Sequence, residues 1–215
     1  MAIIAPGGVV GITTDARTDC VSSLCISKLK PLILTGIFVS IARQHFSLAD
    51  NLREESLREF IWNADDTKSK IMIESATRWK TNIVQQRPAI MVKRMDLHMS
   101  DSITFGDRLQ GGTGTPCAVV LMGSHTLFCI ASSAAEAETL GTELFFQLVE
   151  FKPLLQQEFM FLKLKIDNFG QIAKLEESSE HWVTPITVSY AFSHAWVIDK
   201  IAPVLKSISL VVGEN

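Results

Sequence analysis

The sequence WVTPITVSYAF at residues 182–192 has the most regular pattern in this chain of 215 residues, and it decides the fold class. Apolar residues at the even positions 186–192 alternate with small or polar residues, as in a β-strand that buries one face. Pro185 has no backbone N–H to donate to a neighbouring strand. We therefore expect this strand either to start near Pro185 or to lie at an edge of its sheet.

The residues before this strand predict a long helix and a further extended segment. Ser133 is suited to cap the first turn of a helix, and Glu136 stands three residues later, as in a capping box. We expect the polar side of the helix to include Glu138, Thr142 and Glu143. We expect Pro153 to kink or end it, with residues 154–158 able to add a last turn. The apolar face consists of Leu140, Leu144, Leu148 and Phe151. Residues 159–166 then predict a strand that leads to a turn at 168–170, and residues 175–180 predict an acidic turn.

The first half of the chain contains a second amphipathic helix and several short strands. Pro31 is a favourable first-turn residue, and apolar residues follow it at helical spacing. The predicted buried side of this helix consists of Ile33, Leu34, Ile37, Phe38, Ile41 and Phe46. Strands are predicted at residues 70–74, 88–93, 117–122 and 126–131, with a turn or bulge at 123–125 between the last two. A long polar loop is expected over residues 96–116, and loops of this length are often functional.

These elements together predict an α+β fold. Residues 1–30 show little periodicity and are predicted to form an extended N-terminal arm. Residues 31–215 are predicted to form a single α+β domain, in which a mixed or antiparallel sheet is flanked by two main helices.

The composition narrows the class of protein. Hydrophobic residues make up 47% of the chain and charged residues 20%, which indicates a substantial core and disfavours a disordered chain. A net charge of −3 disfavours a broad nucleic-acid-binding face, because such a face needs a basic surplus. The apolar run at 31–42 is shorter than the roughly 20 residues that span a membrane, and the N-terminus is a poor signal peptide.

Cysteine usage predicts a reducing cytoplasm as the compartment of synthesis. Cys117 and Cys129 lie in an apolar stretch and are expected to be small buried residues. Cys20 and Cys25 lie in the N-terminal arm, where a disulfide is possible but nothing requires one.

Residue patterns predict no catalytic, metal-binding or cofactor-binding site. The glycine-rich residues 111–115 lack the Lys-Ser or Lys-Thr of a phosphate loop. The five histidines are scattered, without the spacing of metal ligands. Ser124 and His125 are adjacent, but neighbouring residues of a strand point to opposite faces of the sheet and are badly placed to act as nucleophile and base.

Several segments resemble a family of tailed-bacteriophage virion proteins, the neck proteins of the tail-terminator type. The resemblance spans residues 33–198 and rests on packing and strand motifs. The segments are ILTGIFV (33–39) with RQHF (43–46), QRPAIMVKR (86–94), GSHTLFC (123–129), and LEE (175–177) through VTPITVSY (183–190).

The resemblance implies a homo-oligomeric ring, commonly of six subunits, in the neck of the virion. Such a ring assembles in the host cytoplasm, ends the tail tube and joins it to the connector or adaptor proteins of the head. DNA passes through its lumen without specific binding, and the near-neutral to acidic charge of this chain suits that passage because cations would hold the phosphates. The resemblance implies no catalytic residue and no cofactor.

Interface candidates follow from the predicted loop, the strand edge and the tryptophans. We expect the loop at 96–116 to contact an adjoining ring, and we expect an open strand edge and tryptophan side chains to contribute to subunit contacts. The candidate interface residues are Asp101, Phe105, Asp107, Arg108, Trp182, Pro185 and Trp196.

Two alternatives stay open at this point. The first is a different part of the head-to-tail connector, such as an adaptor or a stopper. The second is a small-molecule-binding or hydrolytic α+β domain that uses Ser124, His125 and nearby carboxylates. A stable ring favours a neck protein, and a compact monomer with a closed pocket favours an enzyme.

Overall fold

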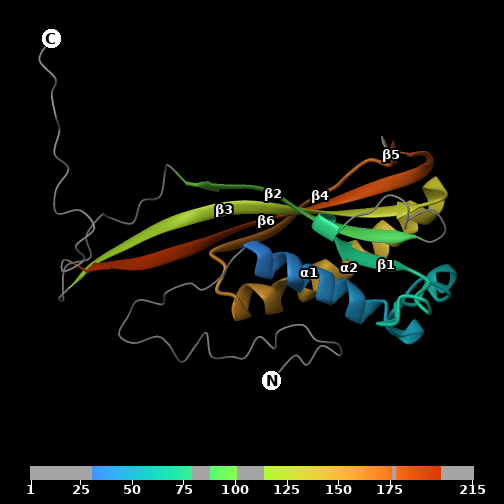
Figure 1. Ribbon diagram of the computed structural model, residues 1–215, viewed down its shortest axis with the longest axis horizontal. Helices are drawn as coiled ribbons and strands as arrows, with labels where there is room; N and C mark the ends of the chain where they lie inside the picture. Colours follow the sequence, from blue (N-terminus) through green and yellow to red (C-terminus); the bar gives the residue numbers. More distant parts are fainter. Residues whose placement is uncertain (1–30, 79–87, 101–113, 176–177, 200–215) are drawn as a thin grey trace, which may run out of the picture.

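The computed structural model describes residues 31–78, 88–100, 114–175 and 178–199, and Figure 1 shows the arrangement of their elements. The two long helices are α1 (Pro31–His45) and α2 (Ala134–Glu158), and single 3-10 turns are formed at η2 (Ala49–Asn51), η3 (Glu55–Leu57) and η4 (Ala76–Arg78). The strands are β1 (Met72–Ser75), β2 (Ala89–Met99), β3 (Gly114–Ala131), β4 (Lys163–Phe169), β5 (Ala173–Leu175) and β6 (Ser178–Asp199).

The six strands form one mixed sheet. Their order is β1-β2-β3-β6-β4, and β5 pairs with β6 as well. β1 runs parallel to β2, and every other pair is antiparallel. The predicted α+β class, with a mixed sheet and two main helices, is therefore confirmed.

Both helices pack on the same face of the sheet (Figure 1), α1 against β1 and β2 and α2 against β3, β4 and β6. The predicted alternation in β6 is confirmed, because Ile186, Val188, Tyr190 and Phe192 are all buried in this helix-facing core. A smaller apolar cluster lies on the opposite face of the sheet. It consists of Met72, Ala89, Met91, Ile130 and Val183, with Phe128 and Leu175 packed against it.

β3 and β6 are much longer than the helices that cover them. Their 18 and 22 residues correspond to roughly 60 and 70 Å, whereas the 25 residues of α2 correspond to about 37 Å. The paired segments 114–121 of β3 and 192–199 of β6 therefore start at the core residue Phe192 and extend from there beyond the helices (Figure 1). We call these paired segments the distal ribbon.

The predicted turn at residues 123–125 is wrong, because β3 is one continuous strand, but an irregularity does occur opposite them, where β2 shifts its register against β3 between Arg94 and Leu97. Gly123 pairs with Tyr190 in an unbroken ladder between β3 and β6. A Cβ atom at Gly123 would lie 2.9 Å from Leu97 Cδ1 and 3.0 Å from the Tyr190 ring. Glycine is needed here because two side chains occupy the space above the backbone, and not because the chain turns.

The predicted loop at 96–116 is also too long. Residues 96–99 belong to β2 and residues 114–116 belong to β3, while the intervening 101–113 lie outside the described residues. β4 continues to Phe169, past the predicted turn at 168, with an irregular register between Ile166 and Asn168.

The helix boundaries agree well with the prediction, and the details differ at three positions. Ser133 caps α2 by accepting a hydrogen bond from the Glu136 backbone N–H at 3.2 Å. The Glu136 carboxylate is bound by the Ser132 hydroxyl at 2.9 Å, so the second half of the capping box involves the neighbouring serine. α2 continues past Pro153 to Glu158, so the helix does not end at the proline and includes the last turn that the sequence allows. Ile33 of α1 is 40% exposed, although its position predicts burial.

Candidate functional site

The predicted interface residues do not form one patch. Asp101, Phe105, Asp107 and Arg108 lie outside the described residues. Trp182 and Pro185 lie in the body of β6, opposite Ala131 and Phe128 of β3. Trp196 lies in the distal ribbon, at a position where the structure describes the backbone alone. Fourteen positions of extended strand separate Trp182 from Trp196, which is roughly 45 Å.

Pro185 does not mark an edge or a strand start, so that prediction is wrong. β6 is an inner strand with β3 on one side and β4 and β5 on the other. The Pro185 carbonyl accepts a hydrogen bond from the Gly170 N–H at 2.7 Å, on the side of β4 and β5. In an antiparallel strand the nitrogen of a residue points to the same side as its carbonyl. The missing N–H of Pro185 therefore faces the connection between β4 and β5, where no strand needs it.

Ser124 and His125 point to opposite faces of the sheet, as the alternation predicts. The His125 ring is fully buried among Phe38, Tyr190 and the Thr35 hydroxyl, which lies 2.8 Å from His125 Nε2. Burial, together with the nearby positive charge of Arg94, lowers the pKa of His125 from 6.5 to about 4. At neutral pH this ring is an uncharged core residue that does not reach Ser124.

Two polar atoms beside His125 have no hydrogen-bond partner in the described part of the chain. These are Nδ1 of His125 itself and the hydroxyl of Tyr190, whose ring centroid lies 5.5 Å from that of His125. Burial raises the pKa of Tyr190 to about 12. Buried groups of this kind are costly in a stable core, so this pair is a weak point in the packing between α1 and the sheet.

An ionic cluster around the buried Glu143 joins the end of α1 to the middle of α2. Glu143 is 1% exposed, and its Oε1 accepts hydrogen bonds from His45 Nε2 at 2.7 Å and from Arg53 Nη1 at 3.2 Å. The backbone N–H of Arg53 donates to the same oxygen at 3.3 Å. A second Arg53 nitrogen, Nη2, lies 2.5 Å from Glu150. Desolvation lowers the pKa of His45, although its hydrogen bond to Glu143 opposes that shift.

The predicted polar exposure of Glu143 is thus wrong. Its position between Leu140 and Leu144 places it at the border of the apolar face of α2. His45 lies 98 residues earlier in the chain, and no local pattern links the two. The cluster borders an open depression of about 300 Å³, which Arg53, Gln147 and Phe151 help to line.

A third polar contact fixes α1 against the edge of the sheet. Arg43 forms an ion pair with Glu74, and its Nε donates to the carbonyl of Ile73 at 3.0 Å. The guanidinium also lies 5.0 Å above the ring of Trp62. These contacts and the ionic cluster both hold the helical layer to the body of the molecule, so their role is structural.

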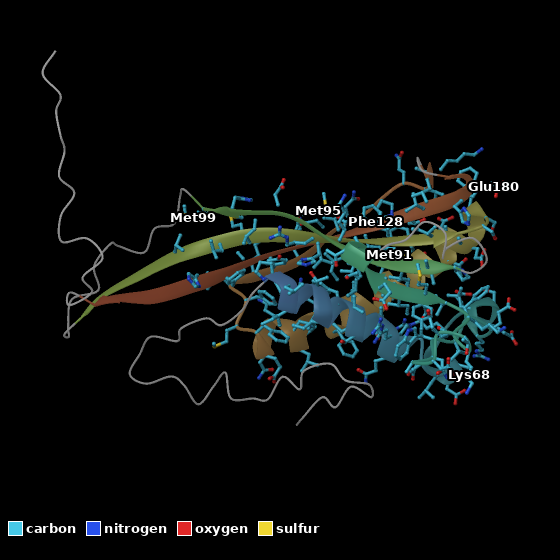
Figure 2. All side chains as sticks on the ribbon, in the orientation of Figure 1. Lys68, Met91, Met95, Met99, Phe128 and Glu180 are labelled. Atoms are coloured by element: carbon cyan, nitrogen blue, oxygen red, sulfur yellow. The ribbon has the colours of Figure 1, made fainter. Side chains whose placement is uncertain are left out.

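The face of the sheet opposite the helices carries small polar residues at its centre. Ser124 pairs with Ser189, and Thr126 pairs with Thr187. The residues between them belong to the helix-facing core, so these four side chains lie on the other face. Figure 2 shows Met95 and Met99 farther along β2, where they are 40% and 63% exposed.

The described residues contain no group of three side chains that could hold a metal ion. Cys129 is a free thiol in the core, and burial raises its pKa, as expected for a small buried residue. None of the described helices combines the length and apolar character needed to cross a membrane. The predictions for Cys20 and Cys25 fall outside the described residues.

No protein-family model and no curated protein matches this chain.

Proposed function

We propose that this chain is a structural protein of a tailed-bacteriophage virion, which forms a homo-oligomeric ring in the neck and has no catalytic role. In this proposal the ring has six subunits, ends the tail tube and joins it to the head connector. The observation that carries the proposal is the distal ribbon. Two long strands continue for many residues past the helices that bury the rest of the sheet.

A ribbon of this kind supports a role in assembly. Strand pairing satisfies the backbone between β3 and β6, but a ribbon without a helical layer has less apolar burial to stabilise it. Proteins retain such extensions where a neighbour completes their packing. A ring subunit needs surfaces for neighbours on two sides, and the ribbon presents two faces away from the body.

The surface chemistry is compatible with DNA passing through the ring. The chain has a net charge of −3, and the centre of the open sheet face is formed by serine and threonine side chains. Lys93 pairs with Thr126 and Lys165 pairs with Ser189 on the same face, so the support for DNA passage is the net negative charge of the whole chain, which gives no cationic surplus to hold phosphates. The placement of His125 in the core also weakens the hydrolytic alternative, because the Ser124 hydroxyl and the His125 ring lie on opposite faces.

The proposal is tested in the particle whose genome encodes the chain. A nonsense mutation in the gene should yield filled heads and separate tails, and expression of the intact chain should restore joined particles. Electron microscopy of purified particles should place a ring of this chain between connector and tube. A normal yield of joined particles from the nonsense mutant would rule the function out. A ring found on the connector side of the neck would instead identify an adaptor or a stopper.

Replacement of residues 101–113 by a Gly/Ser linker of the same length tests the predicted contact with an adjoining ring. It keeps the chain long enough to connect β2, which ends beside Leu121, to the start of β3 at Gly114. We expect a folded subunit that does not restore the joining of heads to tails. His125→Gln should leave joining intact, because the ring is a core residue in this proposal and not a base.

A further inference from the structure

The distal part of β6 has an open edge. β6 pairs with β3 as far as Asp199, but β4, its neighbour on the other side, starts at Lys163 opposite Ala191. The Leu162 N–H makes the last contact on that side, with the Ala191 carbonyl at 2.9 Å. Among the described strands, none pairs with residues 192–199 on the side away from β3. We call this side the open β6 edge.

The backbone alternation decides which groups the open β6 edge presents. The carbonyls of Pro185 and Ala191 both accept hydrogen bonds from the β4 side. Successive residues of an antiparallel strand direct their N–H and C=O groups to opposite sides. The odd-numbered residues of β6 therefore point away from β3, and residues 193, 195, 197 and 199 direct their backbone groups to the open edge.

The edges of β1, of β4 and of the outer part of β2 carry features that discourage pairing, and the open β6 edge does not. β1 has only four residues. β4 carries Lys163 and Lys165 and has an irregular register, and the outer part of β2 carries Lys93, Arg94 and Asp96 around an irregularity. Short edges, lysines and bulges are the usual protections against strand addition. The open β6 edge keeps a regular register with β3 and has no Lys, Arg, Asp or Glu from Phe192 to Ile198.

We propose that two copies of the free protein pair through their open β6 edges, as antiparallel strands about a two-fold axis. A two-fold axis brings the same residues of both copies together, so the edge must be complementary to itself. The open β6 edge meets this condition. When Ser193 of one copy lies opposite residue 199 of the other, and residue 195 lies opposite 197, each odd-numbered residue pairs with an odd-numbered residue. The four residue pairs exchange about eight backbone hydrogen bonds.

The charges at the ends of this pairing also agree. Lys163 of β4 lies opposite Ala191, and Asp199 of the second copy lies opposite Ser193. β6 of the second copy thus lies in line with β4 of the first copy. Along this line the positions of Asp199 and Lys163, which carry opposite charges, follow one another. Because β4 starts only at Lys163, the second copy's strand occupies an edge position that no described strand of the first copy fills.

This dimer is a property of the free protein and does not rest on the neck function. A ring between two unlike partners needs different contacts on its two sides, so such a ring would have to open the two-fold pairing. The dimer and the ring can therefore fail separately. If the free protein dimerises but has no role in the virion, the neck function is contradicted and the dimer stands. If the protein forms the neck ring but is a monomer when free, the dimer is contradicted and the neck function stands.

Ser193→Pro tests the pairing by removing one N–H from the open edge of each copy. The substitution spares the ladder to β3, because the Ser193 backbone points away from it. Sedimentation equilibrium over about 1–100 µM should show a wild-type dimer and a dissociation constant at least about thirtyfold higher in Ser193→Pro. Ser193→Ala keeps the N–H and should change the dissociation constant less than about threefold. A wild-type monomer throughout this range, or equal dimerisation of all three proteins, would overturn the proposal.

Hydrogen exchange of the wild-type protein provides a second measurement that needs no variant. In the dimer the amides of residues 193, 195, 197 and 199 should exchange slowly, and dilution to the monomer should speed their exchange. The amides of residues 192, 194, 196 and 198, which face β3, should change little on dilution. Slow exchange of the odd-numbered amides in the monomer would show that another segment of the same chain covers the edge, and fast exchange in a dimer would place the interface elsewhere. Either result would contradict the proposal.

Discussion

Replacing His125 by Gln should remove much of the acid sensitivity of this fold. The His125 ring is 0% exposed and contacts Thr35, Phe38 and Tyr190. Protonation would place a charge in this core without a carboxylate to balance it, and the nearby Arg94 adds repulsion. Gln keeps a polar group for the Thr35 hydroxyl but takes up no proton.

The size of the effect follows from the two pKa values of His125. The unfolded chain takes up the proton near 6.5, and the folded chain resists it until about 4. The contribution of His125 to stability is therefore complete above about pH 6.5, and it is lost as the pH falls from there towards 4. The loss amounts to about 2 kcal/mol at pH 5 and to about 3 kcal/mol at most.

Urea denaturation at pH 7.5, 6.5, 5.5 and 5.0 measures this loss in the wild type and in His125→Gln. The lowered pKa of His45 adds acid sensitivity in the same direction, so the informative quantity is the difference between the two proteins at each pH. Lowering the pH from 7.5 to 5 should therefore reduce the free energy of unfolding of the wild type by about 2 kcal/mol more than that of His125→Gln. His98→Gln, at an exposed position of β2, serves as the control. A difference that stays constant with pH would refute the reasoning.

Three further predictions concern the free energy of unfolding at neutral pH, measured with urea. Glu143→Gln should lower it by about 1–3 kcal/mol, because Arg53 loses its buried anion. Ser133→Ala should lower it by about 1 kcal/mol through loss of the N-cap of α2, and an unchanged value would mean that water replaces the cap. Gly123→Ala should cost about 1–3 kcal/mol, because its Cβ would meet the Tyr190 ring. Gly36→Ala has open space around it in α1 and should stabilise the fold by up to about 1 kcal/mol. Equal effects at both glycines would contradict the geometry.

The elements that the sequence predicts well are those whose signal is local. The alternation at 186–192 reports one buried face, and β6 buries those residues against α2. The start of α2 is set by one hydroxyl and one backbone N–H three residues apart, so Ser133 and Glu136 suffice to place it. The long sheet, in contrast, depends on which strands meet, and this information is spread over the whole chain.

The wrong predictions concern residues whose meaning depends on distant neighbours. Pro185 is incompatible with an inner strand only if a strand lies on the side that its missing N–H would face, and at the gap between β4 and β5 no described strand lies there. The sequence around Gly123 predicts a turn, but glycine is needed there because a Cβ atom would meet the Tyr190 ring. Glu143 is a polar residue at the border of an apolar helix face. Its burial is explained only by its contacts with His45 and Arg53, which come from a distant part of the chain.

The same dependence on neighbours explains why β3 and β6 can extend beyond the helices. In the body of the sheet, the helices bury the inner face, and the side-chain pattern is strongly constrained. In the distal ribbon the two strands satisfy one another's backbone on one side only, and a third set of partners is needed to complete β6. The surface that matters for assembly is therefore defined less by reactive side chains than by unpaired backbone groups. A function built on such a surface leaves little trace in residue motifs, which is why strand-pairing experiments are a sharper probe of this chain than a search for catalytic residues.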